Sequence, residues 1–222
     1  MEELTVDAGR GRVHPAVWWP GRGDPPGAAA LFPGLNYTPA RPLLHLTTKA
    51  LRTAGFGVLE VWYDYRDLDL TGAAGDPRPE FAADAEAALA LASEHAEHSV
   101  RVAVGKSLGT LHLTELAGRR RLDGVATMWL TPPLDQDVVM DVLRDRSAPT
   151  LVVAGDDDPM SPPERLAALD ADAGPAVTVV QVAGADHNLE RSGASGSLDA
   201  LAEAVRGIER FLDGLDAGAK LR

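Results

Sequence analysis

Residues 100–110 read Val100-Arg-Val-Ala-Val-Gly-Lys-Ser-Leu-Gly-Thr110 and hold the most informative motif in the chain. In its first half, apolar side chains alternate as they do in a strand. Its second half, from Gly105 to Gly109, fits the pattern G-x-S-x-G, and the leucines that follow predict a helix over 108–118. The stretch therefore predicts a strand, a sharp turn at Ser107 and a helix.

A serine on a sharp turn between a strand and a helix is the arrangement called a nucleophile elbow. Such a turn strains the backbone of the serine and brings the residues two before and two after it close together, so glycine fits at 105 and 109. The helix that follows directs its free amides and its positive dipole end at whatever the serine attacks. We therefore take Ser107 as a candidate nucleophile.

The same residues allow a competing interpretation, because Gly105-Lys106-Ser107 also matches the end of the phosphate-binding motif G-x-x-x-x-G-K-[ST]. That motif requires a glycine five residues before Gly105, where this chain has Val100. The would-be loop is also an apolar strand. We therefore interpret Ser107 as a nucleophile and not as part of a nucleotide-binding loop. This interpretation gives Lys106 no chemical role.

The composition predicts one globular domain over residues 1–222. The formal net charge of -12 argues against a nucleic-acid partner and against an anionic membrane surface. The chain has no cysteine, no apolar signal core at its start and no apolar run near the ~20 residues that span a bilayer. We expect a cytoplasmic protein, a monomer or homodimer, from a bacterium with a GC-rich genome.

Short apolar runs alternate with helical patterns along the chain. We expect eight strands, over 4–7, 12–19, 28–32, 56–63, 100–104, 123–130, 149–154 and 177–182. We expect six helices, over 39–54, 80–97, 108–118, 135–146, 162–171 and 198–215. Such alternation predicts an α/β fold with a mostly parallel central sheet and helices on both faces. Pro15 interrupts the second strand, which suits the edge of a sheet.

A serine hydroxyl needs a base to take its proton, and the base needs a carboxylate to fix its tautomer. Functional groups in parallel sheets collect in the loops at the carboxyl ends of the strands. Of the six histidines, only His187 lies in such a loop, at the end of Val182-Ala-Gly-Ala-Asp-His187. His112, on the helix after Ser107, is expected to be packed, so we take His187 as the candidate base.

The acid is expected after the preceding core strand, where Asp156, Asp157 and Asp158 stand side by side. Adjacent side chains alternate in direction, so only one or two of them can face the histidine. We choose Asp158, which is fixed next to Pro159, and keep its two neighbours as stand-ins. A metal site is the rival interpretation of the three aspartates, but one loop supplies too few well-directed oxygens. Asp186 is expected to brace the histidine loop.

These three motifs together resemble the α/β-hydrolase superfamily, in which serine, acid and histidine follow one another in this chain order. The resemblance runs from about Leu4 to Leu215 and rests on Gly105-Lys-Ser-Leu-Gly109, Gly155-Asp-Asp-Asp158-Pro and Gly184-Ala-Asp-His187. It implies a serine hydrolase that acts on an ester or thioester. In the family the acid commonly stands three residues after a strand-end glycine, which is the place of Asp158 after Gly155.

The resemblance also implies an oxyanion hole made of two backbone amides. One belongs to Leu108, and the other comes from the loop after the third strand, with Leu35 preferred over Asn36. Many relatives have His-Gly in that loop, where this chain has Pro33-Gly34. A dienelactone hydrolase proper would have cysteine at the elbow, where this chain has Ser107.

The segment between Leu130 and Pro149 has room for one helix, so we expect little or no cap over the site. The acyl-pocket candidates are Asn36, Tyr37, Tyr65, Trp129 and Met160. We expect a small-molecule acyl substrate and neither a metal nor a cofactor. Two alternatives stay open: acyl transfer or perhydrolysis by the same residues, and a non-catalytic binding protein on this fold.

Overall fold

A computed structural model of the protein describes residues 1–9, 11–22, 25–65, 76–96 and 98–219. The described residues form one sheet in the order β1-β2-β4-β3-β5-β6-β7-β8. These strands are Glu2–Gly9 (β1), Arg12–Trp19 (β2), Ala28–Phe32 (β3), Gly57–Val61 (β4), Val100–Lys106 (β5), Ala126–Leu130 (β6), Thr150–Gly155 (β7) and Val177–Val182 (β8). Across the sheet from β4 to β8, neighbouring strands pair in parallel. The strands β1 and β2 form an antiparallel hairpin, and β2 also pairs antiparallel with β4.

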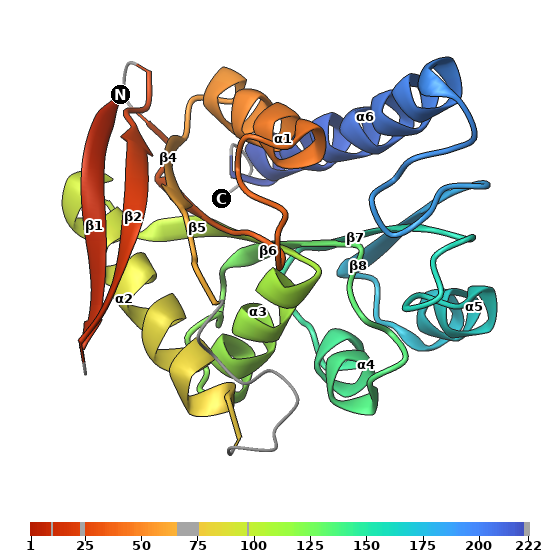
Figure 1. The fold of residues 1–222 in the computed structure, drawn as a ribbon, viewed down its shortest axis with the longest axis horizontal. Coiled ribbons are helices and arrows are strands. Elements are labelled where there is room, and N and C mark those ends of the chain that lie inside the picture. The colour runs from red at the N-terminus through yellow and green to blue at the C-terminus, as the bar shows by residue number, and fades with distance from the viewer. Residues whose placement is uncertain (10, 23–24, 66–75, 97, 220–222) are drawn as a thin grey trace.

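The helices are Pro42–Thr53 (α1), Arg78–Ala96 (α2), Leu108–Gly118 (α3), Asp137–Arg144 (α4), Pro163–Asp172 (α5) and Ala194–Ala219 (α6). The helices α1 and α6 cover one face of the sheet, and α2, α3, α4 and α5 cover the other (Figure 1). Side chains on alternate positions of each central strand enter these two apolar layers. The α/β architecture with a mostly parallel sheet is therefore confirmed.

Between β6 and β7 the chain forms only the short helix α4, so no cap is inserted there. The carboxyl ends of β3, β5, β7 and β8 meet at one edge of the sheet, as parallel pairing requires. No helix in the described part of the chain combines the length and apolar character needed to cross a membrane.

Pro15 does not lie on an edge strand, so that prediction was wrong. The strand β2 lies between β1 and β4, and Pro15 pairs with Thr5 of the edge strand β1. The ladder between β2 and β4 ends at Ala16 and Val61, and beyond it the Pro15 carbonyl accepts a hydrogen bond from the Trp62 amide at 2.8 Å. Proline has no N–H with which to continue this ladder, and the ladder ends beside it.

Two helices begin three or more residues away from their predicted starts. The helix α1 begins at Pro42, three residues later than expected, because the Arg41 amide closes a turn on the Thr38 carbonyl at 2.9 Å and proline suits the first helical position. The helix α6 begins at Ala194, four residues earlier than expected. There the Ser197 hydroxyl donates to the Gly193 carbonyl at 3.1 Å, which offsets the poor helix propensity of this first turn.

Candidate active site

The turn at Ser107 has the predicted elbow geometry. Ser107 joins β5 to α3 with φ 50° and ψ -116°, which is a strained conformation for a residue with a side chain. A Cβ at Gly105 would lie 2.5 Å from the Gly109 carbonyl oxygen, and one at Gly109 would lie 2.0 Å from the Phe32 carbonyl oxygen. Larger residues at either position would force the backbone apart, which confirms why both must be glycine.

A chain of hydrogen bonds joins Ser107, His187 and Asp158. The Ser107 Oγ lies 2.7 Å from His187 Nε2, and His187 Nδ1 lies 2.8 Å from Asp158 Oδ2. Asp158 is 2% exposed, and its second oxygen accepts a hydrogen bond from the Met160 amide at 2.9 Å. An ionised Asp158 requires the proton of a neutral His187 to sit on Nδ1, so Nε2 is free to accept the serine proton.

The loops that carry the acid and the histidine pack directly on each other. A Cβ at Gly155 would lie 1.9 Å from the Ala185 carbonyl oxygen, and the Asp157 amide donates to the same oxygen at 3.1 Å. Asp186 braces its own loop as expected, since one carboxylate oxygen accepts hydrogen bonds from two following amides, at 2.8 and 2.9 Å. The sequence shows the glycine at 155 but not the strand-end contact that requires it.

The three adjacent aspartates point in different directions. Asp156 accepts hydrogen bonds from the Gly184 amide and the Gln181 side chain, Asp157 is exposed, and only Asp158 faces His187. Within the described ranges, no group of three acidic or histidine side chains is placed to hold a metal ion. The metal interpretation of this loop therefore has no support in the structure.

A tight turn after β3 lies against the elbow. The Tyr37 amide donates to the Gly34 carbonyl at 3.1 Å, and Asn36 adopts φ 56° at the third position of this turn. A Cβ at Gly34 would lie 3.2 Å from the Ser107 Cβ, so the turn packs directly on the serine. Among the described residues, no acceptor is hydrogen-bonded to the amides of Leu35, Asn36 or Leu108, so these amides are available to a ligand.

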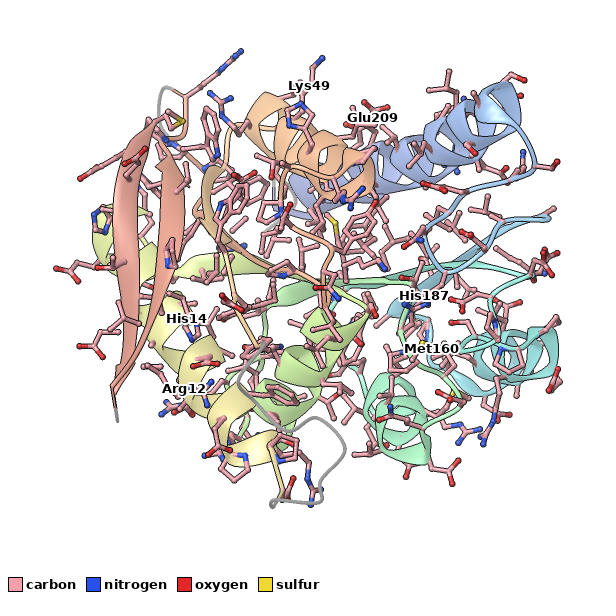
Figure 2. All side chains as sticks on the ribbon, viewed as in Figure 1. Arg12, His14, Lys49, Met160, His187 and Glu209 are labelled. Atoms are coloured by element: carbon pink, nitrogen blue, oxygen red, sulfur yellow. The ribbon has the colours of Figure 1, made fainter. Side chains whose placement is uncertain are left out.

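The five pocket candidates lie in different environments, some buried in the core and some near the site. Trp129 has no exposure and donates to the Thr127 hydroxyl at 3.0 Å within the core, so it does not line an open pocket. Tyr65 is 6% exposed, and its hydroxyl donates to the buried Asp84 carboxylate at 2.8 Å. Both assignments were wrong because burial at a strand end depends on packing from elsewhere in the chain. Tyr37 is buried beneath the turn, Asn36 is exposed on it, and Met160 lies with His187 beside Asp158 (Figure 2).

A cavity of about 220 Å³ opens beside the elbow, between α3 and the starts of α2 and α4. Phe81, Leu108, Leu111 and Val138 contribute apolar side chains to its wall, and Arg78, Glu115 and Gln136 also line it. Leu108 directly follows Ser107, so the cavity adjoins the proposed reaction centre. The sequence could not reveal this cavity, because its walls come from three separate helices.

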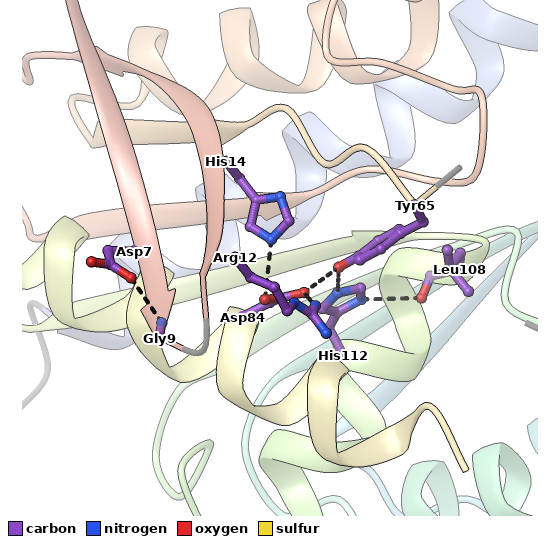
Figure 3. Close-up of polar contacts among 8 residues, drawn as sticks. All are labelled: Asp7, Gly9, Arg12, His14, Tyr65, Asp84, Leu108 and His112. Carbon is purple, nitrogen blue, oxygen red and sulfur yellow. Dashed lines mark hydrogen bonds and ion pairs between the residues drawn. The ribbon is translucent and has the colours of Figure 1, made fainter. Parts of the chain in front are cut away.

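A buried polar cluster ties the elbow helix to the sheet and to α2 (Figure 3). Asp84 contacts Arg12, lies 3.1 Å from His14 Nε2 and accepts a hydrogen bond from the Tyr65 hydroxyl at 2.8 Å. Burial raises the pKa of the Asp84 carboxyl, but hydrogen bonds from His14 and Tyr65 and the charges of His14 and Arg12 outweigh it, so the net pKa lies below its ordinary value.

The cluster reaches the elbow through His112, which is fully buried as expected. Its Nε2 lies 2.6 Å from the Tyr65 hydroxyl, and its Nδ1 lies 3.3 Å from the Leu108 carbonyl. Burial lowers the pKa of His112 to about 4, so the ring is neutral at pH 7. A neutral ring has one N–H, so it donates to either the Tyr65 oxygen or the Leu108 carbonyl. The Tyr65 contact links α3 to the polar cluster.

Comparison with protein-family models decides the family, because residues 38–213 match the model of the alpha/beta hydrolase domain. The chain belongs to the alpha/beta hydrolase domain family. No curated protein sequence matches it. The resemblance inferred from the elbow, acid and histidine motifs is thus confirmed at the level of the family.

Several solved structures share the fold. Est1E from Butyrivibrio proteoclasticus, in a structure with ferulic acid bound, is 14% identical, with a TM-score of 0.75 over 96% of this chain and 99% of that chain. A serine hydrolase without a lid from Xanthomonas campestris is 18% identical, with a TM-score of 0.69 over 95% and 94%. A dienelactone hydrolase from Anabaena variabilis is 19% identical, with a TM-score of 0.67 over 91% and 94%. At these identities the likeness shows the fold alone.

Proposed function

We propose that this alpha/beta hydrolase is a serine hydrolase that cleaves a carboxylic ester or thioester through an acyl-enzyme on Ser107. The observation that carries the proposal is the hydrogen-bonded chain from the Ser107 Oγ through His187 to the buried Asp158, at 2.7 and 2.8 Å. A binding protein has no need for a strained serine aligned with a histidine and a buried acid. We further place the enzyme in the bacterial cytoplasm, without a metal or cofactor.

The first half-reaction forms the acyl-enzyme. His187 Nε2 takes the Ser107 proton as Oγ attacks the substrate carbonyl, and Asp158 stabilises the resulting imidazolium. The amides of Leu108 and Leu35 donate to the carbonyl oxygen as it becomes an oxyanion, each worth about 3 kcal/mol in the barrier. The tetrahedral intermediate collapses, and the leaving alcohol or thiol takes the proton from His187.

The second half-reaction repeats the steps with water as the nucleophile. His187 removes a proton from water, hydroxide attacks the acyl carbon, and the Ser107 oxygen leaves with the proton that His187 returns. The products are a carboxylic acid and the free serine. An alcohol that enters in place of water would yield a new ester by the same steps.

We assign the acyl group of the substrate to the cavity beside Leu108, which we call the elbow cavity. The leaving oxygen must lie near His187 Nε2 to receive its proton, so the alcohol side of the ester points toward His187. The acyl side then extends past Leu108 into the cavity, whose lining does not include His187. A volume of about 220 Å³ is below the ≈ 300–1,000 Å³ of pockets for drug-sized ligands, so it suits a short chain or a single ring.

The proposal is tested with a panel of p-nitrophenyl esters of increasing chain length, supplemented with ethyl ferulate because Est1E binds ferulic acid. Wild-type protein should release nitrophenol from the short esters, and Ser107→Ala and His187→Ala should lose at least about 1,000-fold in kcat. Addition of a competing alcohol separates hydrolysis from acyl transfer through the products. Turnover that is unchanged in Ser107→Ala would refute the proposed nucleophile.

A further inference from the structure

Lys106 occupies the one variable elbow position to which the proposed mechanism gives no role. Its side chain is only 2% exposed. Alternation along β5 places it on the same face as Val102 and Val104, under the layer formed by α1 and α6. A lysine is seldom buried unless something in the structure uses or stabilises its charge.

The buried side chain runs beneath the turn that presents the oxyanion amide. Its Cδ lies 3.0 Å from the position that a Cβ of Gly34 would occupy, and its ammonium lies 4.4 Å from the centroid of the Tyr37 ring. The stem thus supports the first residue of the turn, and the charged end packs on the face of the last residue. Attraction between an ammonium and an aromatic face strengthens when both are removed from water.

Tyr37 can transmit this contact because both its backbone and its hydroxyl are held by hydrogen bonds. Its amide closes the turn on the Gly34 carbonyl at 3.1 Å. Its hydroxyl accepts a hydrogen bond from the Leu43 amide in α1 at 3.3 Å. The turn therefore rests on a fixed ring, and the ring rests on the ammonium.

The charges around the ammonium come from the loops after β7 and β8. Burial lowers the pKa of Lys106 to about 8, and the carboxylates of Asp158 and Asp186 oppose this fall. On the turn itself, the facing titratable group is Tyr37, whose phenol pKa is raised by burial. Among the described residues, no carboxylate lies within ion-pair distance of Lys106, so the ring is its direct partner. The side chain is thus charged at pH 7 and close to losing that charge.

We propose that Lys106 is a positioning residue for the reaction at Ser107: its charged side chain holds the Gly34–Tyr37 turn, and with it the oxyanion amide, against the elbow. The inference rests on the proposed function and adds a reason for lysine at this position. Loss of the charge should release the turn, so that the transition state is stabilised less while substrate still enters the same cavity. The effect is therefore expected in kcat and not in KM.

The test measures kcat and KM of one short p-nitrophenyl ester across about pH 6 to 10 for wild type, Lys106→Met and Lys106→Arg. Methionine keeps an unbranched stem without the charge, whereas arginine keeps a charge that stacks on tyrosine. Lys106→Met should lower kcat at pH 7 about 10- to 100-fold, which is less than the loss caused by removing an oxyanion donor altogether. The KM should stay within about twofold of the wild-type value. Lys49→Met, at an exposed position on α1, is the matched control and should match wild type.

The pH profile separates positioning from simple packing. The wild-type kcat should fall as pH rises through about 8, because Lys106 loses its proton there. The kcat of Lys106→Met should be low and should not fall near pH 8. The kcat of Lys106→Arg should be higher than that of Lys106→Met and should also not fall near pH 8. Tyr37→Leu should reproduce the loss seen in Lys106→Met, and Tyr37→Phe, which keeps the ring under the ammonium but loses the hydroxyl contact with Leu43, should lose less activity than Tyr37→Leu.

Three results would overturn the inference: wild-type kcat in Lys106→Met, a decline near pH 8 that persists in that variant, or full activity in Tyr37→Leu. These differ from failure of the proposed function itself, in which wild-type protein shows no Ser107-dependent turnover at all.

Discussion

Replacement of Lys106 by methionine should make the protein more stable while it becomes less active. At neutral pH the fold holds an ammonium that burial disfavours, since its pKa falls from 10.5 to about 8. Each pKa unit corresponds to about 1.4 kcal/mol, so the charged form costs about 3 kcal/mol of folding free energy. The contact with the Tyr37 ring returns roughly 1–2 kcal/mol. Lys106→Met should therefore gain about 1–2 kcal/mol at pH 7.

The gain should depend on pH in a defined direction. Below pH 8 the lysine is charged in both the folded and the unfolded chain, so the full cost is present. As pH rises through the folded pKa of about 8 toward the unfolded value of 10.5, the folded protein loses its proton first, and the cost shrinks. The stability difference between variant and wild type should therefore narrow over this window.

Urea unfolding followed by circular dichroism measures this difference directly, at about pH 7 and again near pH 10. Lys49→Met serves as the control, because its side chain is exposed and its removal changes the net charge equally. If Lys106→Met were less stable than wild type at pH 7, the buried charge would not be a net cost to the fold. A gain that stays constant up to pH 10 would show that it does not come from the charge. A residue that destabilises the fold and supports the reaction is a stability–activity compromise.

Three further predictions concern the turn, the cavity and the polar cluster. Leu35→Pro removes one amide proton at a turn position that suits proline, so kcat should fall about 100-fold; an unchanged kcat would assign the donor to Asn36. Leu111→Trp fills the elbow cavity, so kcat/KM should fall about tenfold more for an octanoate than for an acetate ester; equal losses would exclude the acyl assignment. Asp84→Ala leaves Arg12 and His14 without their carboxylate, so urea unfolding should show a loss of about 3–5 kcal/mol; a loss below about 1 kcal/mol would show that the cluster is not a structural anchor.

The sequence predicts well those features that depend only on residues close together in the chain. The alternation in β5, the glycines on either side of Ser107 and the leucines of α3 all act within a few residues. The same holds for the strand-end loops that carry Asp158 and His187, because a parallel sheet brings such loops to one edge. The alignment of these side chains was an expectation from the sequence, and the structure brings them within hydrogen-bond distance.

The features that sequence missed depend on contacts between distant segments. Trp129 and Tyr65 stand at strand ends, yet helices from elsewhere in the chain bury them. The support of Gly34 by Lys106 requires the register between β3 and β5, which no local pattern encodes. The place of Pro15 depends in the same way on where the ladder with β4 ends.

Covalent labelling tests whether Ser107 is the nucleophile. Wild-type protein is incubated with a fluorophosphonate, and the modified residue is located by peptide mass spectrometry. We predict one adduct per chain on Ser107, no adduct in Ser107→Ala, and much slower labelling in His187→Ala, because His187 Nε2 lies 2.7 Å from the serine Oγ. An unlabelled wild-type protein, or an adduct that persists in Ser107→Ala, would contradict this prediction.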